Sequence, residues 1–245
     1  MNNSFISDID LKLLKEKYQG ESLDIAINKI KNGYPVQYLI GNVNFYGNKI
    51  TVNENVLIPR FETEFLVDLI SNILDKSKDY KILDIGTGSG CISISLGKIF
   101  ISSNITGIDI SQKAIDVAND NKIINAVNNV DFIHKDLFQM DNFNGYDVIV
   151  SNPPYVSKNE PVGEETKYEP QNAIFADNDG LVFYENIIKK VSLSKKIKHI
   201  FFEIGMTQSS PIIEFKNKYL DNYEINIYKD LSGKDRYVHI YLNNI

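Results

Sequence analysis

Residues 81–90 read KILDIGTGSG, an apolar run of strand type that leads into Gly86, Gly88 and Gly90. A helical pattern begins directly afterwards, near Cys91. Glycine permits positive φ and lets a ligand lie against the backbone, and the helix N-terminus behind the turn offers unpaired N–H groups. The stretch therefore predicts a strand–turn–helix unit that binds a cofactor.

Further apolar runs of strand type follow this unit, separated by segments with helical spacing. The strand-like runs lie at residues 104–110, 130–136, 146–154 and 199–205. Helical patterns occur near 91, from 111, near 180–195 and near 209–219, and one more, at 62–77, precedes the unit. Such alternation predicts an α/β fold with a doubly wound, mostly parallel, Rossmann-like sheet. The last two runs, 223–231 and 236–242, are joined by too few residues for a crossover helix, so we expect an antiparallel C-terminal strand.

The first part of the chain has a different pattern. Apolar residues at helical spacing come first, and residues 43–53 (VNFYGNKITVN) then predict a hairpin around a Gly47-Asn48 turn. We expect a short N-terminal helical and hairpin region over residues 1–55, followed by the α/β domain over residues 56–245.

Composition excludes several classes of protein. The 245 residues carry a formal charge of −6, which disfavours stable nucleic-acid binding through a broad basic surface. The single Cys91 excludes an intramolecular disulfide framework and suits a reducing, cytoplasmic location. Neither a membrane-spanning run nor, in residues 1–10, a secretory signal is expected. The three histidines lack ligand spacing, so no metal site is expected.

Asp109 ends the second strand-like run after the glycine turn. A carboxylate at this position can accept hydrogen bonds from both ribose hydroxyls of an adenosine, in NAD and in S-adenosylmethionine sites alike. Dinucleotide binders place glycines as G-x-G-x-x-G/A, but here Cys91 occupies the last position. No Lys-Ser/Thr pair follows, which excludes a P-loop. The turn and Asp109 leave both cofactors open.

Asn152-Pro153-Pro154-Tyr155 stands at the carboxyl end of the run that begins at Tyr146, the edge of an α/β sheet where ligands bind. The two prolines make the loop stiff. The Asn152 side-chain oxygen and the Pro153 carbonyl could hold both hydrogens of a planar –NH₂ group, and Tyr155 could stack on it. The motif predicts catalysis by positioning, without a strong base; the alternative is a loop that merely turns after a strand.

DIGTGSG, Asp109 and NPPY together resemble the S-adenosylmethionine-dependent amino-methyltransferases. Other segments resemble, more narrowly, the release-factor glutamine methyltransferases of the PrmC/HemK type. These segments are GYPVQYLIGNVNFYGNKITVNENVLIPRFETEFLV (33–67), YEPQNAIFADNDGL (168–181), FFEIG (201–205) and KDLSGKDR (229–236). The resemblance runs from Gly33 to the C-terminus, with its motifs in the family's order.

This resemblance implies a class I methyltransferase fold and an enzyme that uses S-adenosyl-L-methionine and releases S-adenosyl-L-homocysteine. The family methylates the side-chain amide nitrogen of the glutamine in the Gly-Gly-Gln motif of peptide-chain release factors, which are the implied partners. The implied cofactor-binding residues are Gly86, Thr87, Gly88, Ser89 and Gly90 as the cradle, Asp109 on the ribose, Asp136 and Leu137 beside the adenine, and Asn152. The implied substrate-binding residues are Asn152, Pro153, Pro154 and Tyr155, and Arg60, Glu62 and Thr63 are implied at the cofactor mouth.

Three departures from the family pattern stand out. Phe61 replaces a proline, Ala176-Asp177 replaces a glycine pair, and the segment before Gly33 is shorter than the family's multi-helix N-terminal domain, which helps to dock the release factor in relatives.

Two alternative functions stay open at this point. One is an amino-methyltransferase acting on an exocyclic base amine of RNA or DNA, because that group is also an –NH₂ on a planar π system. The other is a cofactor-dependent binding module that assembles with a larger partner. Individual residues also have alternatives: Asp136 as a helix cap, Arg60 as an ion-pair partner, and Glu203 as either a site-rim group or a structural hydrogen-bonding group.

Overall fold

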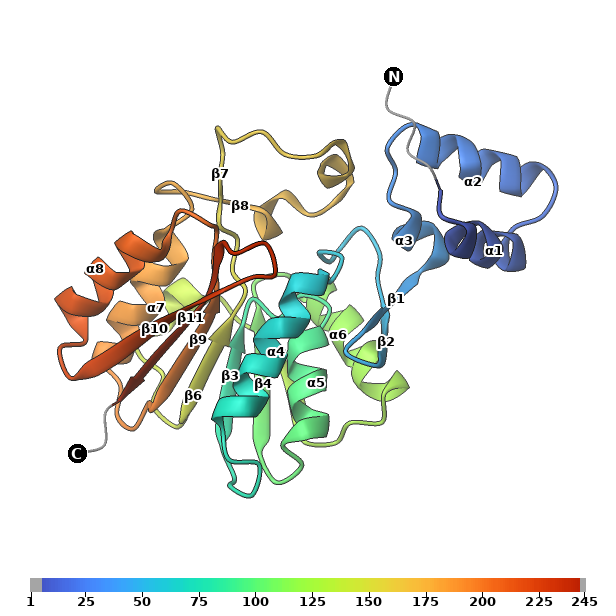
Figure 1. The fold of residues 1–245 in the computed structure, drawn as a ribbon. Helices are drawn as coiled ribbons and strands as arrows, with labels where there is room; N and C mark the ends of the chain where they lie inside the picture. Colours follow the sequence, from blue (N-terminus) through green and yellow to red (C-terminus); the bar gives the residue numbers. More distant parts are fainter. Residues whose placement is uncertain (1–5, 243–245) are drawn as a thin grey trace.

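The computed structural model describes residues 6–242, and Figure 1 shows a helical N-terminal part beside a larger α/β body. The N-terminal part consists of α1 (Asp8–Lys17), α2 (Glu21–Lys31) and α3 (Val36–Ile40). Its helices bury a small apolar core of their own, made of Leu14, Ala26, Ile30 and Leu39. The expectation that no secretory signal is present concerns residues 1–10, of which 1–5 lie outside the described residues.

The body is built on a seven-stranded sheet with the order β10-β11-β9-β6-β3-β4-β5. Its strands are β3 (Lys81–Ile85), β4 (Asn104–Asp109), β5 (Val130–His134), β6 (Val148–Ser151), β9 (His199–Glu203), β10 (Tyr223–Lys229) and β11 (Asp235–Leu242). The five strands from β9 to β5 are parallel, and β11 runs antiparallel to both of its neighbours. The predicted fold class is confirmed, including the antiparallel strand at the C-terminal end.

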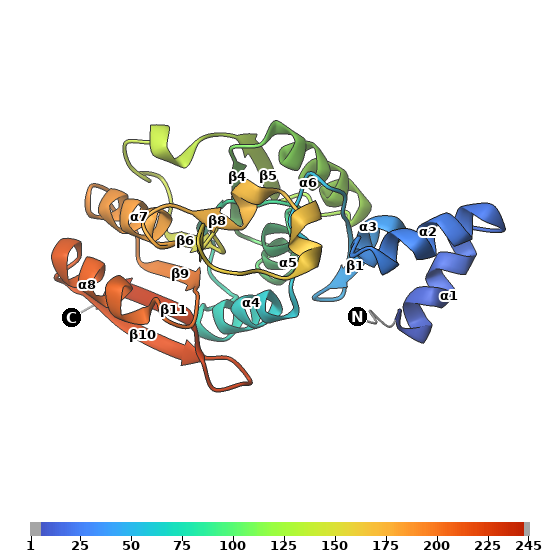
Figure 2. The ribbon, with the colours of Figure 1, turned by 90° about the horizontal axis from the view of Figure 1, so that it is seen from above.

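Helices cover both faces of this sheet (Figure 2). Residues of α4 (Phe61–Ile73), α5 (Cys91–Ile99) and α6 (Gln112–Ile124) share one core with the sheet, and residues of α7 (Val182–Ser192) and α8 (Ser209–Tyr219) share the other. Among the helices within residues 6–242, none is long and apolar enough to cross a membrane.

The helix predicted over residues 62–77 is shorter in the structure, because α4 ends at Ile73. The Asp75 carboxylate accepts hydrogen bonds from the backbone N–H and the hydroxyl of Ser77. Such a local side-chain turn competes with the helical hydrogen-bond pattern and ends it.

The N-terminal hairpin consists of β1 (Asn42–Phe45) and β2 (Asn48–Thr51), which pair antiparallel. Its turn is Tyr46-Gly47, with φ of 50° and 73°, so the predicted Gly47-Asn48 turn was wrong by one residue. Two consecutive positive φ angles are typical of the tight turn that fits the twist of a hairpin. Asn48 belongs to the strand instead, where its buried amide donates to the Ser95 hydroxyl at 3.1 Å.

The hairpin packs on the α/β body, since Phe45 and Ile50 belong to the large core of that body. Asn121 of α6 fixes it there: its side-chain oxygen accepts from the Thr51 N–H at 2.7 Å, and its Nδ2 donates to the carbonyls of Thr51 and Ser89. One side chain therefore ties the hairpin to the glycine-rich turn. The division of the chain at residues 55 and 56 stays a prediction.

A segment of short elements lies over the carboxyl ends of the parallel strands (Figures 1 and 2). It contains β7 (Val156–Ser157), η2 (Glu164–Tyr168), η3 (Gln171–Ala173) and β8 (Phe175–Ala176), and one more 3₁₀ turn, η1 (Leu137–Gln139), follows β5. Strands β7 and β8 form a parallel pair. This segment, residues 156–176, covers the edge of the sheet where the sequence motifs gather.

Candidate active site

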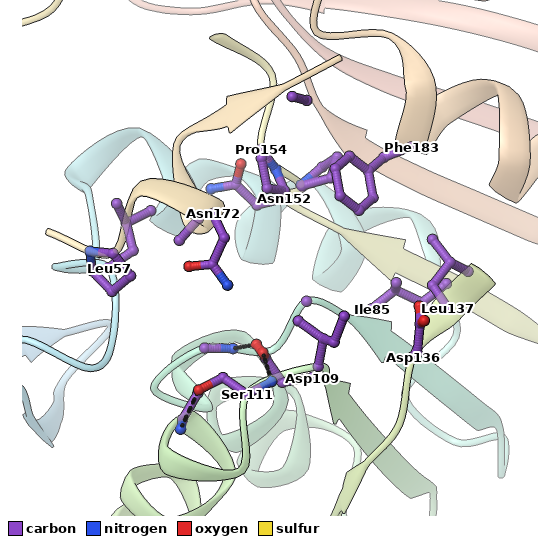
Figure 3. Close-up of a pocket in the computed structure, with 18 of the residues that line it drawn as sticks. Leu57, Ile85, Asp109, Ser111, Asp136, Leu137, Asn152, Pro154, Asn172 and Phe183 are labelled. Atoms are coloured by element: carbon purple, nitrogen blue, oxygen red, sulfur yellow. Dashed lines mark hydrogen bonds between the residues drawn. The ribbon is translucent and has the colours of Figure 1, made fainter. Parts of the chain in front are cut away.

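A cavity of about 330 Å³ opens at the carboxyl ends of β3, β4 and β6. Figure 3 shows Ile85, Asp109 and Asn152, each from the end of one of these strands, around the same space. Strand β3 lies between β4 and β6, so the strand order reverses at this point. Ligands of open α/β sheets bind where the order reverses, and the cavity occupies that position.

The glycines of the turn divide into two kinds. Gly86 and Gly88 line the cavity at φ of 73° and 54°, and a Cβ added to either meets no atom within 4 Å. Their backbone therefore faces open space in which a ligand can lie. Gly90 instead starts α5, and a Cβ there would be 2.6 Å from the ring of Phe132. Gly90 is required for packing, and it does not line the cavity.

Thr87 and Ser89 are buried beneath the turn and do not line the cavity either. The Thr87 hydroxyl donates to the Asp84 carboxylate at 2.7 Å, as does the Ser93 hydroxyl. Burial raises the pKa of Asp84 to about 6. Among the described residues, Asp84 Oδ1 is the one buried side-chain oxygen or nitrogen without a hydrogen-bond partner. Thr87 therefore stabilises the turn through its hydrogen bond to Asp84 and does not contact the cavity.

Asp109 is placed where the sequence predicts it. Its two carboxylate oxygens accept from the Gly88 and Ser111 N–H groups, both at 2.9 Å. Burial raises its pKa, and these backbone hydrogen bonds oppose the rise by stabilising the charged form. Each oxygen retains a lone pair, because a carboxylate has about four acceptor sites and only two are used. The side chain is thus rigid and still able to accept hydrogen bonds from a ligand.

Asp136 and Leu137 also line the cavity, at its opposite end from Leu57 and Asn172 (Figure 3). The Asp136 carboxylate accepts from the Phe138 N–H at 2.8 Å and caps η1, so the capping interpretation is correct, although the residue also faces the cavity. Leu137 is buried, and the rings of Phe138 and Phe183 lie 5.4 Å apart beside it. This end offers apolar surface suited to an aromatic base.

The residues of NPPY are placed differently from one another. Asn152, Pro153 and Pro154 line the cavity, whereas Tyr155 does not. The Tyr155 carbonyl accepts from Gln208 Nε2 at 2.9 Å, which holds the loop from behind. Burial raises the pKa of Tyr155 to about 12, so its hydroxyl stays protonated. The stacking of Tyr155 on a substrate stays a prediction.

Asn152 is connected to two further buried residues. Its Nδ2 donates to Thr63 Oγ1 at 3.1 Å, and the Thr63 hydroxyl donates to Glu203 Oε2 at 2.7 Å. Thr63 and Glu203 are 3% and 2% exposed. Burial raises the pKa of Glu203 to about 7. Of the two interpretations left open for Glu203, the structural hydrogen bond is present.

Arg60 and Glu62 lie outside the residues that line the cavity. Arg60 forms an ion pair with Glu169, whose side chain is fully buried, and also donates to the Ile58 carbonyl. Glu169 in turn accepts from the Ile58 N–H at 2.9 Å. The ion-pair interpretation of Arg60 is therefore correct, and the pair joins the start of α4 to the 156–176 segment. Glu62 is exposed, and its carbonyl accepts from the Tyr237 hydroxyl.

Sequence reasoning missed several residues that line the cavity. Leu57 and Asn172 close one end of it and Phe183 lies above it, as Figure 3 shows. Leu57 and Asn172 lie inside two segments that carried the family resemblance, VLIPR and YEPQNA. Their position within these motifs was the signal that could have identified them as cavity residues. Phe183, on α7, had no such signal.

Comparison with known proteins decides the family. Residues 62–175 match the family described as methyltransferase small domain. The release factor glutamine methyltransferase of Flavobacterium psychrophilum is 39% identical over 241 residues, which cover 94% of this chain and 83% of the relative. That of Fusobacterium nucleatum is 40% identical over 231 residues, which cover 92% of this chain and 65% of the relative.

This chain belongs to the release factor glutamine methyltransferases. As a member of this family it is an S-adenosylmethionine-dependent methyltransferase, which resolves the choice between the two cofactors that the glycine turn left open. The resemblance noted in the sequence is thereby confirmed.

Solved structures agree on the fold of this methyltransferase. The hMettl16 catalytic domain in complex with MAT2A 3'UTR hairpin 1 is similar at a TM-score of 0.65 and 17% identity, covering 95% of this chain and 91% of that one. At this identity the likeness shows the class I fold alone.

The cavity of this methyltransferase fits its cofactor. Gly86 and Gly88 leave the backbone open to a ligand, and Asp109 has lone pairs available for ribose hydroxyls. The apolar end at Leu137 suits an adenine ring. Within the described residues, 6–242, no group of three or more His, Cys, Asp or Glu side chains could hold a metal ion.

Proposed function

We propose that this methyltransferase transfers a methyl group from S-adenosylmethionine to the side-chain amide nitrogen of the glutamine in the Gly-Gly-Gln motif of peptide-chain release factors. Family membership supports the acceptor. The observation that carries the chemistry is the placement of Asn152. Its Nδ2 is engaged by Thr63, so its Oδ1 is left to accept hydrogen bonds at the cavity, next to Pro153.

In this proposal the residues at the ends of β3 and β4 would hold the cofactor. Asp109 accepts hydrogen bonds from the ribose hydroxyls, Gly86 and Gly88 let the methionine part approach the backbone, and Asp136 and Leu137 lie beside the adenine. Thr87, Ser89 and Gly90 act from beneath, by keeping the turn in shape. When bound, S-adenosylmethionine would supply a methyl carbon on a cationic sulfonium: the C–S bond breaks as the N–C bond forms, S-adenosylhomocysteine leaves as a neutral thioether, and the methylated nitrogen releases one of its two protons to water.

The residues beyond β6 hold the acceptor in this proposal. The lone pair of an amide nitrogen is delocalised, which makes it a poor nucleophile. Asn152 Oδ1 and the Pro153 carbonyl accept its two hydrogens and turn the face of the nitrogen toward the methyl carbon. Pro154 keeps the loop stiff, and Tyr155 supports the planar group. Catalysis then comes mainly from alignment, which suits a donor that is already activated.

The protein partner follows from the same proposal. The release factor delivers its glutamine to the cavity, the reaction takes place in the cytoplasm, and stable nucleic-acid binding is not required. The body within residues 56–245 carries both the cofactor and the acceptor positions, and the region within residues 1–55 is available for docking.

Methyl transfer to purified release factor tests this function. We expect intact-mass analysis of a co-expressed release factor to show one added methyl group, located by peptide fragmentation on the glutamine of Gly-Gly-Gln. A release factor with that glutamine changed to alanine is the control and should stay unmethylated. Labelled methyl groups incorporated into total RNA or DNA instead would contradict the proposal and favour a base amine as the acceptor.

A further inference from the structure

We propose that Thr63 and Glu203 are positioning residues that fix the amide of Asn152 with its oxygen, and not its nitrogen, toward the acceptor. The inference rests on the proposed function for its catalytic consequence. The hydrogen-bonded arrangement itself stands on geometry, and it links three elements that are far apart in the chain.

The sheet register brings Asn152 and Glu203 together. Strands β6 and β9 are parallel neighbours in which Ser151 pairs with Phe202, so Asn152, directly after β6, lies at the level of Glu203, the last residue of β9. Side chains alternate between the faces of a sheet. Val150 and Phe201 both lie in the core that includes α4, so Asn152 and Glu203 leave the sheet toward that same face.

Helix α4 supplies the third residue. Thr63 lies in its first turn and is almost completely buried. The Thr63 oxygen lies 2.7 Å from Glu203 Oε2 and 3.1 Å from Asn152 Nδ2, so it bridges the ends of the two strands.

The single hydroxyl proton of Thr63 fixes the direction of both hydrogen bonds. A threonine hydroxyl has one hydrogen to donate and two lone pairs to accept with. Because Thr63 donates that hydrogen to the Glu203 carboxylate, it can only accept from Asn152. The nitrogen end of the Asn152 amide must therefore face Thr63, which leaves the oxygen end free to face the cavity that Asn152 lines.

The orientation matters because the acceptor is itself a donor of hydrogen bonds. A glutamine –NH₂ offers two hydrogens. The Pro153 carbonyl can accept one of them, and the other meets an acceptor only if Asn152 presents oxygen. A rotated Asn152 amide would set N–H groups against N–H groups and leave buried donors unpaired, which is costly. A free asparagine amide has no built-in preference between the two orientations, so the fixed proton of Thr63 provides one.

The charge on Glu203 controls the direction of the two hydrogen bonds of Thr63. Burial raises the pKa of Glu203 to about 7, so it gains a proton in mildly acidic solution. A protonated Glu203 can donate to Thr63, which frees the Thr63 hydrogen to point at the Asn152 oxygen. The ionisable groups that act on Glu203 or feel its charge are Arg60 and Glu62 at the start of α4, Cys91 of α5, Tyr155 after β6, Tyr184 of α7, and Arg236 and Tyr237 of β11.

Four variants test the proposal by kinetics. Thr63→Val removes the acceptor while keeping the shape, and we expect kcat for methyl transfer to fall about 30-fold with the dissociation constant for S-adenosylhomocysteine within about twofold. Thr63→Ser keeps the hydroxyl and should restore kcat to within about threefold. Ser71→Ala removes a buried hydroxyl further along α4, where it donates to the Asp68 carbonyl, and should not change kcat.

The fourth variant, Glu203→Gln, reports on the charge. We expect the wild type to lose kcat as the pH falls through about 7, and this acidic limb to be absent in Glu203→Gln, which cannot gain a proton. An acidic limb that persists in Glu203→Gln would contradict the role given to the charge on Glu203. Normal kcat in Thr63→Val, or equal losses of kcat and cofactor affinity in Thr63→Val and Thr63→Ser, would overturn the proposal.

A measurement without substrate separates this proposal from the proposed function. In protein labelled with ¹⁵N on asparagine, the Asn152 side-chain resonance is assigned by its loss in Asn152→Ala. We expect one of its Nδ2 protons to exchange slowly in the wild type and in Thr63→Ser, and quickly in Thr63→Val. Unchanged exchange in Thr63→Val overturns the positioning proposal. Failure of the wild type to methylate a release factor contradicts the proposed function alone.

Discussion

The half of the cavity formed by β3 and β4 presents mainly backbone groups, whereas the half beyond β6 presents side chains tied to one another across three elements. In the first half, Gly86 and Gly88 expose their backbone and Asp109 is held by two N–H groups. In the second half, Asn152 depends on Thr63 and Glu203. The difference suggests a division of tasks: the first half supplies affinity for the cofactor and the second supplies alignment of the acceptor.

The largest expected effect separates the two halves directly. Asn152→Ala removes one of the two proposed acceptors, and we expect single-turnover methyl transfer to fall about 1000-fold. The dissociation constant for S-adenosylhomocysteine, measured by calorimetry, should stay within about threefold of the wild type. Near-normal transfer in this variant would contradict the role given to Asn152.

Asp109→Ala should show the reverse pattern. It removes the acceptor proposed for the ribose hydroxyls, and we expect cofactor affinity to fall about 30-fold, while kcat at saturating cofactor changes much less. Asp116→Ala is a matched control, because Asp116 is a carboxylate on the adjoining helix that accepts from Gln112 at the surface. A loss of kcat without a loss of affinity in Asp109→Ala would reverse the proposed division.

The dependence of folding stability on pH tests the burial of Glu203, which belongs to the half of the cavity beyond β6. The pKa of Glu203 is about 7 when folded and 4.5 as its ordinary value, so the folded state binds the extra proton between these two pH values. Stability therefore falls as the pH rises from about 4.5 to 7, and the loss is complete above that range. We expect Glu203→Gln to gain about 2 kcal/mol over the wild type at pH 8 and little at pH 4.5, measured by urea unfolding.

A contradictory result in that experiment would be a Glu203→Gln protein that is less stable than the wild type at pH 8. It would mean that the ionised carboxylate stabilises the fold. The expected gain would mean instead that the protein tolerates a destabilising buried charge in the substrate half of the cavity.

The smallest effect concerns Phe61, which stands where relatives are expected to have proline. Phe61 is the first residue of α4 and is 63% exposed, and the preceding Arg60 has an extended backbone. Proline fits the first position of a helix and an extended residue before it. We expect Phe61→Pro to change the free energy of unfolding by no more than about 0.5 kcal/mol, because the lost edge contact with Phe65 offsets the gain. A loss of several kcal/mol would show that Phe61 has a structural function.

The cavity residues that stand at the ends of strands could be predicted from the sequence, in both halves of the cavity. Parallel strands end at the same edge, so Gly86, Asp109 and Asn152 meet there once the alternation of strands and helices is recognised. Thr87, Ser89 and Gly90 belong to the same turn but face away from the cavity, which the motif alone does not reveal.

The links within the substrate half could not be predicted in the same way. Thr63 and Glu203 are joined only by the register of β6 against β9 and by the packing of α4, and no local pattern encodes either. The ion pair of Arg60 with Glu169 depends on the same kind of long-range packing. The hairpin turn was misplaced for a local reason, since Tyr46 adopts a positive φ that the sequence pattern does not favour.

The bridge made by Asn121 has a practical consequence for building chimeras. The Asn121 side chain joins Thr51 of β2 to Ser89 of the glycine-rich turn. The α/β body therefore needs strand β2 in place, whichever segment precedes the hairpin. A foreign front end should therefore be grafted before Gly41, where α3 ends, so that the recipient keeps its own hairpin. Grafting after Val56 would remove the Thr51 partner and loosen the glycine-rich turn that the methionine part of the cofactor is proposed to approach.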